Sequence, residues 1–80
     1  MINTTLLEFN KNNRKFQSLK DMSLVAIPSK DDKVVIDIDG IGYVFKVYDV
    51  HYGIEGRIDI NVIRIANVTD YNLSKFPDIK

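Results

Sequence analysis

The side chains best suited to acid–base chemistry or metal binding lie in one stretch, at Asp49, His51, Asp59 and Asn61. The strand pairing expected around the turn after Tyr52 places His51 opposite Asp59 and Asp49 opposite Asn61. A histidine beside a carboxylate can act as an acid, a base or a metal ligand. A flat hairpin offers no pocket and no nucleophile, however, and one histidine with two aspartates is a poor metal set. We therefore expect a solvated His–Asp pair, no enzymatic activity, no metal site and no cofactor.

A second group combines basic and aromatic side chains. We expect Lys46 and Arg64 to share one outer face with Asp37, where they pair with charges on neighbouring strands. Together with Arg57 and a tyrosine, these cations can bind nucleic acid, as some small barrels do. The eleven basic and eleven acidic residues cancel, however, so the chain has no long-range field that attracts phosphates or anionic lipid. Nucleic acid is therefore the less favoured partner, and no membrane partner is expected.

Composition points to one small globular domain that spans residues 1–80. The chain is 45% hydrophobic and 28% charged, which is typical of folded domains. It contains no cysteine, so disulfides and thiolate metal sites are excluded. No apolar run approaches the roughly 18 residues of a membrane span, and residues 1–9 lack the pattern of a signal peptide. We therefore expect a cytoplasmic location.

The central part of the chain alternates apolar and polar residues with period two, which predicts an antiparallel meander. Its strands are expected at about 33–39, 42–52 and 57–67. A two-residue type II′ turn at Gly40-Ile41 connects the first two strands and places Ile38 opposite Tyr43. A three-residue loop that ends in a left-handed Gly56 connects the next two.

The alternation changes phase once in each long strand, at Val47-Tyr48 and at Val62-Ile63. In the expected register the two switches lie at the same level of the sheet. The apolar face on one side of them comprises Val34, Ile36, Ile38, Tyr43, Phe45, Val47, Ile63 and Ile65. The set beyond them, on the opposite face, comprises Tyr48, Val50, Tyr52, Ile58, Ile60 and Val62. A bulge near Val47 or Val62 is the other interpretation, because the resulting bend would turn both sets inward as in a small barrel.

The first 22 residues follow a different pattern. Apolar side chains at Leu6, Phe9, Phe16 and Leu19 recur at spacings of three and seven, which favours one helix between residues 4 and 22. Asn12 or Asn13 is the expected cap of this helix. Further along, a short strand is expected at Leu24 to Ile27, and Asp70 is expected to cap a helical turn from Tyr71 to Phe76.

The predicted fold class is therefore mainly β (α+β). It is a small antiparallel meander of three to five strands with one helical segment near the N-terminus. Residues 1–22 are assigned to the helical or irregular segment, 23–68 to the meander, and 69–80 to a C-terminal turn or tail. In strand count and hairpin succession residues 23–68 resemble small SH3-like barrels, which implies a barrel or a bent sheet.

The second apolar set suggests a function, because an apolar patch of that size on a monomer often marks an interface. The candidate partner-binding residues are Tyr48, Val50, Tyr52, Ile58 and Ile60. There are three interpretations of what buries this surface: the C-terminal segment of the same chain, a second copy in a homodimer, or a foreign protein. We expect a non-catalytic protein-binding module, such as a phage or mobile-element inhibitor or adaptor. The alternative is a small-barrel nucleic-acid-binding protein.

Overall fold

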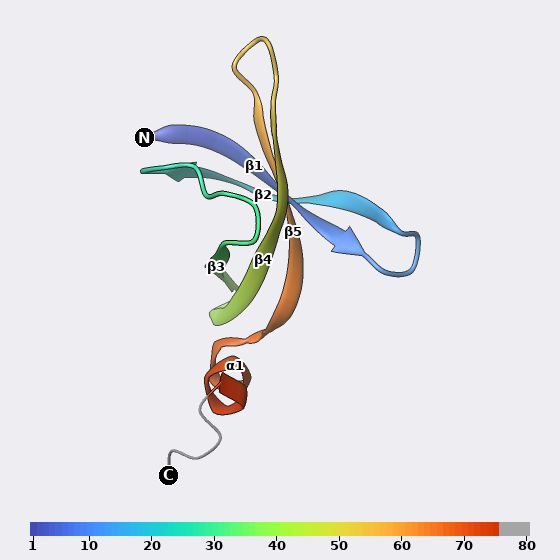
Figure 1. The fold of residues 1–80 in the computed structure, drawn as a ribbon, viewed down its shortest axis with the longest axis vertical. Coiled ribbons are helices and arrows are strands. Elements are labelled where there is room, and N and C mark those ends of the chain that lie inside the picture. The colour runs from blue at the N-terminus through green and yellow to red at the C-terminus, as the bar shows by residue number, and fades with distance from the viewer. Residues whose placement is uncertain (76–80) are drawn as a thin grey trace.

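The computed structural model describes residues 1–75, which form a strongly curled sheet followed by one short helix (Figure 1). The strands are β1 (Ile2–Asn10), β2 (Lys15–Leu24), β3 (Lys33–Ile38), β4 (Ile41–Tyr52) and β5 (Ile58–Asn67), and the helix is α1 (Val68–Lys75). They lie in the order β2-β1-β5-β4-β3. The β1–β5 pair is parallel, and every other pair is antiparallel. The result is a half-barrel that is open between its two edge strands, β2 and β3.

The predicted N-terminal helix is wrong, because this segment forms the β1–β2 hairpin. Asparagines that were expected to cap a helix build the hairpin loop instead. The Asn12 amide donates to Asn10 Oδ1 at 2.8 Å, and the Lys15 amide donates to Asn13 Oδ1 at 3.0 Å. The loop closes when the Arg14 amide donates to the Asn10 carbonyl at 2.8 Å, with Arg14 at φ 58°. Asparagine suits such turns because its side chain bonds nearby backbone groups.

This hairpin has the apolar spacing of a helix because its apolar residues lie on both faces of the sheet. The β1–β2 register shifts between Leu6, opposite Lys20, and Leu7, opposite Ser18. Leu19 is therefore an extra residue on β2, and it packs against the core. Phe16 pairs with Phe9 on the opposite face of the sheet. The intervals of three residues, Leu6 to Phe9 and Phe16 to Leu19, are odd spacings along strands, which place the two side chains on opposite faces of the sheet, and not helical turns.

The predicted fold class is also wrong in topology. We expected an antiparallel meander, but the N-terminal hairpin joins the meander through a parallel pairing that runs from Thr5 opposite Asp59 to Glu8 opposite Val62. The expected strand at Leu24 to Ile27 does not form, since β2 ends at Leu24. The likeness to SH3-like barrels therefore does not extend to the strand order of this sheet.

The two turns of the meander differ in how well they were predicted. The loop that ends in a left-handed Gly56 (φ 93°) is confirmed. The Gly56 amide donates to the Gly53 carbonyl at 3.1 Å and so closes the turn. The first turn is wrong by one position, because its two central residues are Asp39 (φ 52°) and Gly40 (φ 84°). Two positive φ angles define a type I′ turn, for which Asp-Gly is a preferred pair. Ile38 consequently lies opposite Ile41.

The expected bulge in β4 is present and resolves the phase switch of that strand. Val47 pairs with Val62 and Asp49 with Asn61, so Tyr48 is the extra residue. Val47 and Val50 therefore both face the core despite their odd spacing. On β5 the pairing runs without a shift from Val62 to Arg64, opposite Phe45, so the next inward side chain is Arg64 in place of the expected isoleucines. Beyond this point the register shifts again, because Val44 lies opposite Ala66, and Ile65 is an extra residue on β5.

The hydrophobic core fills the concave side of the half-barrel. Its fully buried members are Leu6, Ile36, Phe45, Val47, Ile60 and Val62. Half-buried apolar side chains from β2, β3, β4 and β5 surround them. The open side between β2 and β3 is bridged by Lys20, whose Nζ donates to the Asp37 carbonyl at 3.5 Å.

The helix α1 follows β5 directly and packs on the end of the β4–β5 ribbon (Figure 1). It was expected to start after Asp70, but its N-cap is Asn67, whose Oδ1 accepts the Asp70 amide at 2.7 Å. The expected end of this turn at Phe76 and Pro77 lies outside the described residues. In residues 1–75 no helix is long and apolar enough to cross a membrane.

Candidate binding surface

The five predicted partner-binding residues lie on the β4–β5 ribbon but not on one face of it. The bulge turns Tyr48 to the face away from the core, while Tyr52 shares the core side with Val50 and the two isoleucines. The residues also differ in exposure. Tyr48 and Tyr52 are 50% and 67% exposed. Val50 and Ile58 are half-buried, and Ile60 is fully buried in the core. The two tyrosines are therefore the members that can contact a partner, while the three aliphatic side chains support the ribbon from the core side.

Tyr48 belongs to an aromatic cluster that the sequence did not indicate. Its ring centroid lies 5.6 Å from that of Phe16, and Phe16 lies 5.3 Å from Phe9. The bulge brings Tyr48 into this contact. It turns the Tyr48 side chain from the core face of β4 to the opposite face of the sheet, which we call the back face and on which Phe9 and Phe16 lie. The aromatic cluster (Phe9, Phe16, Tyr48) thus joins β2 and β1 to β4 on the side away from the core.

A cleft opens between β1 and β5 next to this cluster. The two strands pair only as far as Glu8 opposite Val62, and beyond this point they separate (Figure 1). The tip of the β1–β2 hairpin projects away while β5 continues toward α1 (Figure 1). The β1–β5 cleft has a volume of about 360 Å³ and is lined by Glu8, Phe9, Lys11, Tyr43, Ile63, Arg64, Ile65, Ala66 and Asn67. Its lining comes from both faces of the sheet, because the sheet itself is open there.

An ion pair between Glu8 and Arg64 holds the two strands where they begin to separate. Arg64 Nη2 donates to Glu8 Oε1 at 2.9 Å, and Arg64 Nε lies 2.8 Å from Glu8 Oε2 in a contact whose geometry is that of an ion pair and not of a hydrogen bond. The guanidinium also lies over two rings, 4.5 Å from the centroid of Tyr43 and 5.2 Å from that of Phe45. Arg64 was expected on the outer face with Lys46 and was therefore misplaced.

The tip of the β1–β2 hairpin carries three exposed cations, Lys11, Arg14 and Lys15. Among residues 1–75 none of the three has an acidic side chain within ion-pair distance. The segment from Phe9 to Lys20 contains no acidic residue at all. We refer to Lys11, Arg14 and Lys15 as the basic tip.

The acid–base candidates occupy the back face of the β4–β5 ribbon in the expected register, with His51 opposite Asp59 and Asp49 opposite Asn61. His51 contacts Asp49 rather than Asp59, with Nε2 3.1 Å from Oδ2. Asn61 Nδ2 donates to the other oxygen of Asp49 at 2.7 Å. In the described part of the chain no three such residues are placed to hold a metal ion. The arrangement is a surface network that stabilises the hairpin.

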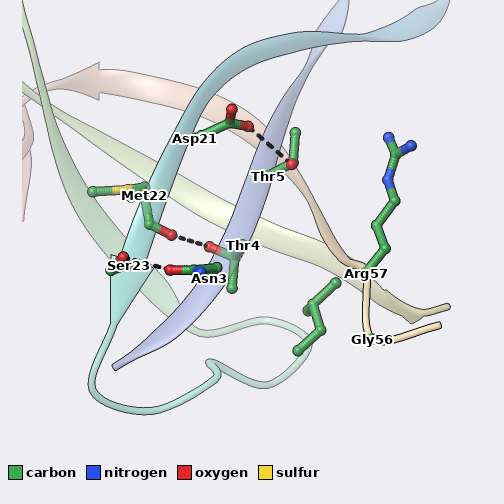
Figure 2. A pocket seen from close by; sticks show the side chains of 9 residues that line it. Asn3, Thr4, Thr5, Asp21, Met22, Ser23, Gly56 and Arg57 are labelled. Atoms are coloured by element: carbon green, nitrogen blue, oxygen red, sulfur yellow. Dashed lines mark hydrogen bonds between the residues drawn. The ribbon is translucent and has the colours of Figure 1, made fainter. Parts of the chain in front are cut away.

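A shallow hollow of about 520 Å³ lies farther along the same face, between the β1–β2 strands and the β4–β5 turn (Figure 2). Its polar groups bind one another: Thr5 Oγ1 donates to Asp21 Oδ1 at 2.9 Å, and Ser23 Oγ donates to Asn3 Oδ1 at 2.8 Å. Arg57 stands at its rim and donates from Nε to Asp59 Oδ1 at 2.8 Å. This hydrogen bond and the charge of Asp59 raise the pKa of Arg57.

The comparisons with known proteins found no match to this chain among protein-family models, curated proteins or solved structures. Its function must therefore be inferred from the surface features described above.

Proposed function

We propose that this chain is a non-catalytic binding module that occupies a surface on another protein. The observation that carries the proposal is the exposure of Tyr48 and Tyr52 on one strand of the ribbon, Tyr48 on the face away from the core and Tyr52 on the core side beyond the buried residues. Tyrosines dominate the energetics of many interfaces because they provide a large apolar area and a polar group at low entropic cost. An inhibitor or adaptor encoded by a phage or mobile element is the specific form of the proposal.

The cations needed for the nucleic-acid alternative are already paired within the chain. Lys46 Nζ lies 3.4 Å from Asp31, and Arg64 is held by Glu8. Arg57 is hydrogen-bonded to Asp59. Each partner reduces the charge available to a phosphate, so the geometry gives this alternative no specific support.

Affinity capture from the host of this chain, followed by mass spectrometry, tests the proposal when it is done with matched variants. Tyr48→Ser combined with Tyr52→Ser should fold normally, because both side chains are at least half exposed, and should lose the captured protein. Ile41→Ser removes an apolar side chain of 50% exposure from the other end of β4 and should retain it.

Three results would count against the proposal. Equal capture by both variants would show that the tyrosines do not contact the partner. Unfolding of the tyrosine variant would show that they belong to the core. A solution mass of twice the chain mass, reduced to one chain by the tyrosine variant, would show that the surface is covered by a second copy instead.

A further inference from the structure

We infer that the β1–β5 cleft accepts an extended, acidic and apolar segment of the partner protein, which adds to β5 as a strand. The inference rests on the proposed function and specifies what kind of segment is bound and where. It follows from the backbone of β5, from the apolar side chains of the cleft and from the charge of the hairpin beside it.

The backbone of β5 has an unpaired edge inside the cleft. Residues 63, 64, 66 and 67 pair with β4 on one side, with Ile65 as a bulged residue between them, but β1 has no paired residue beyond Glu8 on the other. Since backbone groups along a strand point alternately to its two sides, about half of those in residues 63–67 point into the gap. A free strand edge of this kind is a template for an added strand, in which main-chain hydrogen bonds supply affinity.

The outer edges of the half-barrel are less suited to this role. β2 contains the bulge at Leu19, and Lys20 bridges its open side to Asp37. β3 has only six residues and carries charges at Lys33 and Asp37. Charged side chains and short strands are features by which proteins protect sheet edges from further pairing, whereas the bulge on β2 has a counterpart at Ile65 on β5.

Apolar side chains flank the free edge of β5. Ile65 is 44% exposed, and Ile63 and Phe9 are half-buried. All three line the cleft. An added strand presents alternate side chains to the two faces of the sheet, so one set of its residues would lie against these apolar groups. That set is expected to be β-branched or aromatic.

The charge around the cleft selects an acidic segment. Lys11 lines the cleft, and the rest of the basic tip (Arg14 and Lys15) continues along the same hairpin. The acidic residue of the lining, Glu8, is already neutralised by Arg64. The remaining charge is positive, and a complementary charge on the partner increases association rate and specificity.

A protein segment fits this surface better than a nucleic acid strand. The ring of Phe16 packs on the rings of Phe9 and Tyr48, and these contacts occupy ring surface that a base would need for stacking. Pairing with the backbone of β5 also requires the N–H and C=O groups of a peptide.

The test is a titration of the ¹⁵N-labelled full chain, followed by NMR, with a synthetic peptide that alternates valine and glutamate. The comparison probes are a peptide that alternates valine and lysine, and an oligothymidylate with the same charge as the glutamate peptide. We expect the glutamate peptide to shift the amides of residues 63–67, to slow their exchange with solvent, and to bind more weakly as salt is raised. The lysine peptide and the oligothymidylate should bind more weakly.

Two variants and a control locate the binding. Lys11→Glu and Ile65→Asp each place a negative charge on the lining and should weaken peptide binding about three- to tenfold. Lys30→Glu makes the same charge change on an exposed loop and should leave binding within about twofold. Thermal unfolding of each variant confirms that it is folded.

Four results would overturn the inference: no binding of the glutamate peptide, equal or tighter binding of the lysine peptide, tighter binding of the oligothymidylate, or amide shifts confined to β2 or β3. The inference and the proposed function can also fail separately. If a captured host protein is lost with the Tyr48 and Tyr52 variant but binds Lys11→Glu and Ile65→Asp unchanged, the cleft is excluded while the proposed function stands.

Discussion

Arg64 is the residue whose removal should affect the fold most specifically, because it acts on three elements at once. It forms the ion pair with Glu8 across β1 and β5, and it covers the rings of Tyr43 and Phe45. The side chains of the ion pair are 35% and 26% exposed for Arg64 and Glu8, so water screens the pair less than at an open surface. We therefore expect Arg64→Ala to lower the free energy of unfolding by more than the loss of an exposed ion pair does.

The magnitude can be estimated from these contacts. A hydrogen bond to a charged group contributes about 1.5–3 kcal/mol, and we take the lower value because Arg64 is one-third exposed. Two cation–π contacts, one to the half-buried ring of Tyr43 and one to the buried ring of Phe45, add about 0.5–1 kcal/mol each. The total for Arg64→Ala is about 3 kcal/mol, which corresponds to a fall in Tm of about 12–24 °C for a domain of this size.

Chemical denaturation by urea measures this loss, and a double-mutant cycle isolates the ion pair. Combining Arg64→Ala with Glu8→Gln should give a coupling free energy of about 1–2 kcal/mol. Lys46→Gln is the matched control, because its pair with Asp31 is 48% and 65% exposed and should contribute less than about 1 kcal/mol. If Arg64→Ala costs no more than Lys46→Gln, or if the coupling is zero, the role assigned to Arg64 is wrong.

Two further substitutions test local features of the fold. Gly40→Ala should destabilise by about 1–2 kcal/mol in urea denaturation, because no atom lies within 4 Å of an added Cβ and the cost comes from φ +84° alone; a loss near zero would contradict the type I′ turn. Asn67→Ala removes the N-cap of α1 and should cost about 1 kcal/mol. Its expected signature is a weaker helical circular dichroism signal, while an unchanged signal would show that Asn67 does not cap the helix.

The meander could be predicted from the sequence because its signals are local. Period-two alternation located β3, β4 and β5 to within a residue or two, and Gly56 marked its turn. The first turn was misplaced by one residue, because Gly40-Ile41 has the glycine-first pattern of a type II′ turn, whereas the chain forms a type I′ turn at Asp39-Gly40. The bulge at Tyr48 was predicted as one of two interpretations, since both explain the same phase switch.

The remaining features depend on contacts between distant parts of the chain. Nothing in the sequence near β1 specifies a parallel partner, and apolar residues on both faces of the β1–β2 hairpin imitate a helical spacing. Glu8 and Arg64 are 56 positions apart, so their pairing depends on the register of β1 against β5. The cleft and the aromatic cluster arise where these strands separate and cross. The exposed tyrosines were predictable, but the surface that surrounds them was not.

The central claim is that Tyr48 and Tyr52 bind another protein, and titration calorimetry with the captured partner tests it most directly. The unaltered chain should bind with a negative heat-capacity change, which marks burial of apolar surface. Tyr48→Ser with Tyr52→Ser should weaken binding at least about thirtyfold, equivalent to about 2 kcal/mol, while the fold is retained. Unchanged affinity of a folded double variant would contradict the claim.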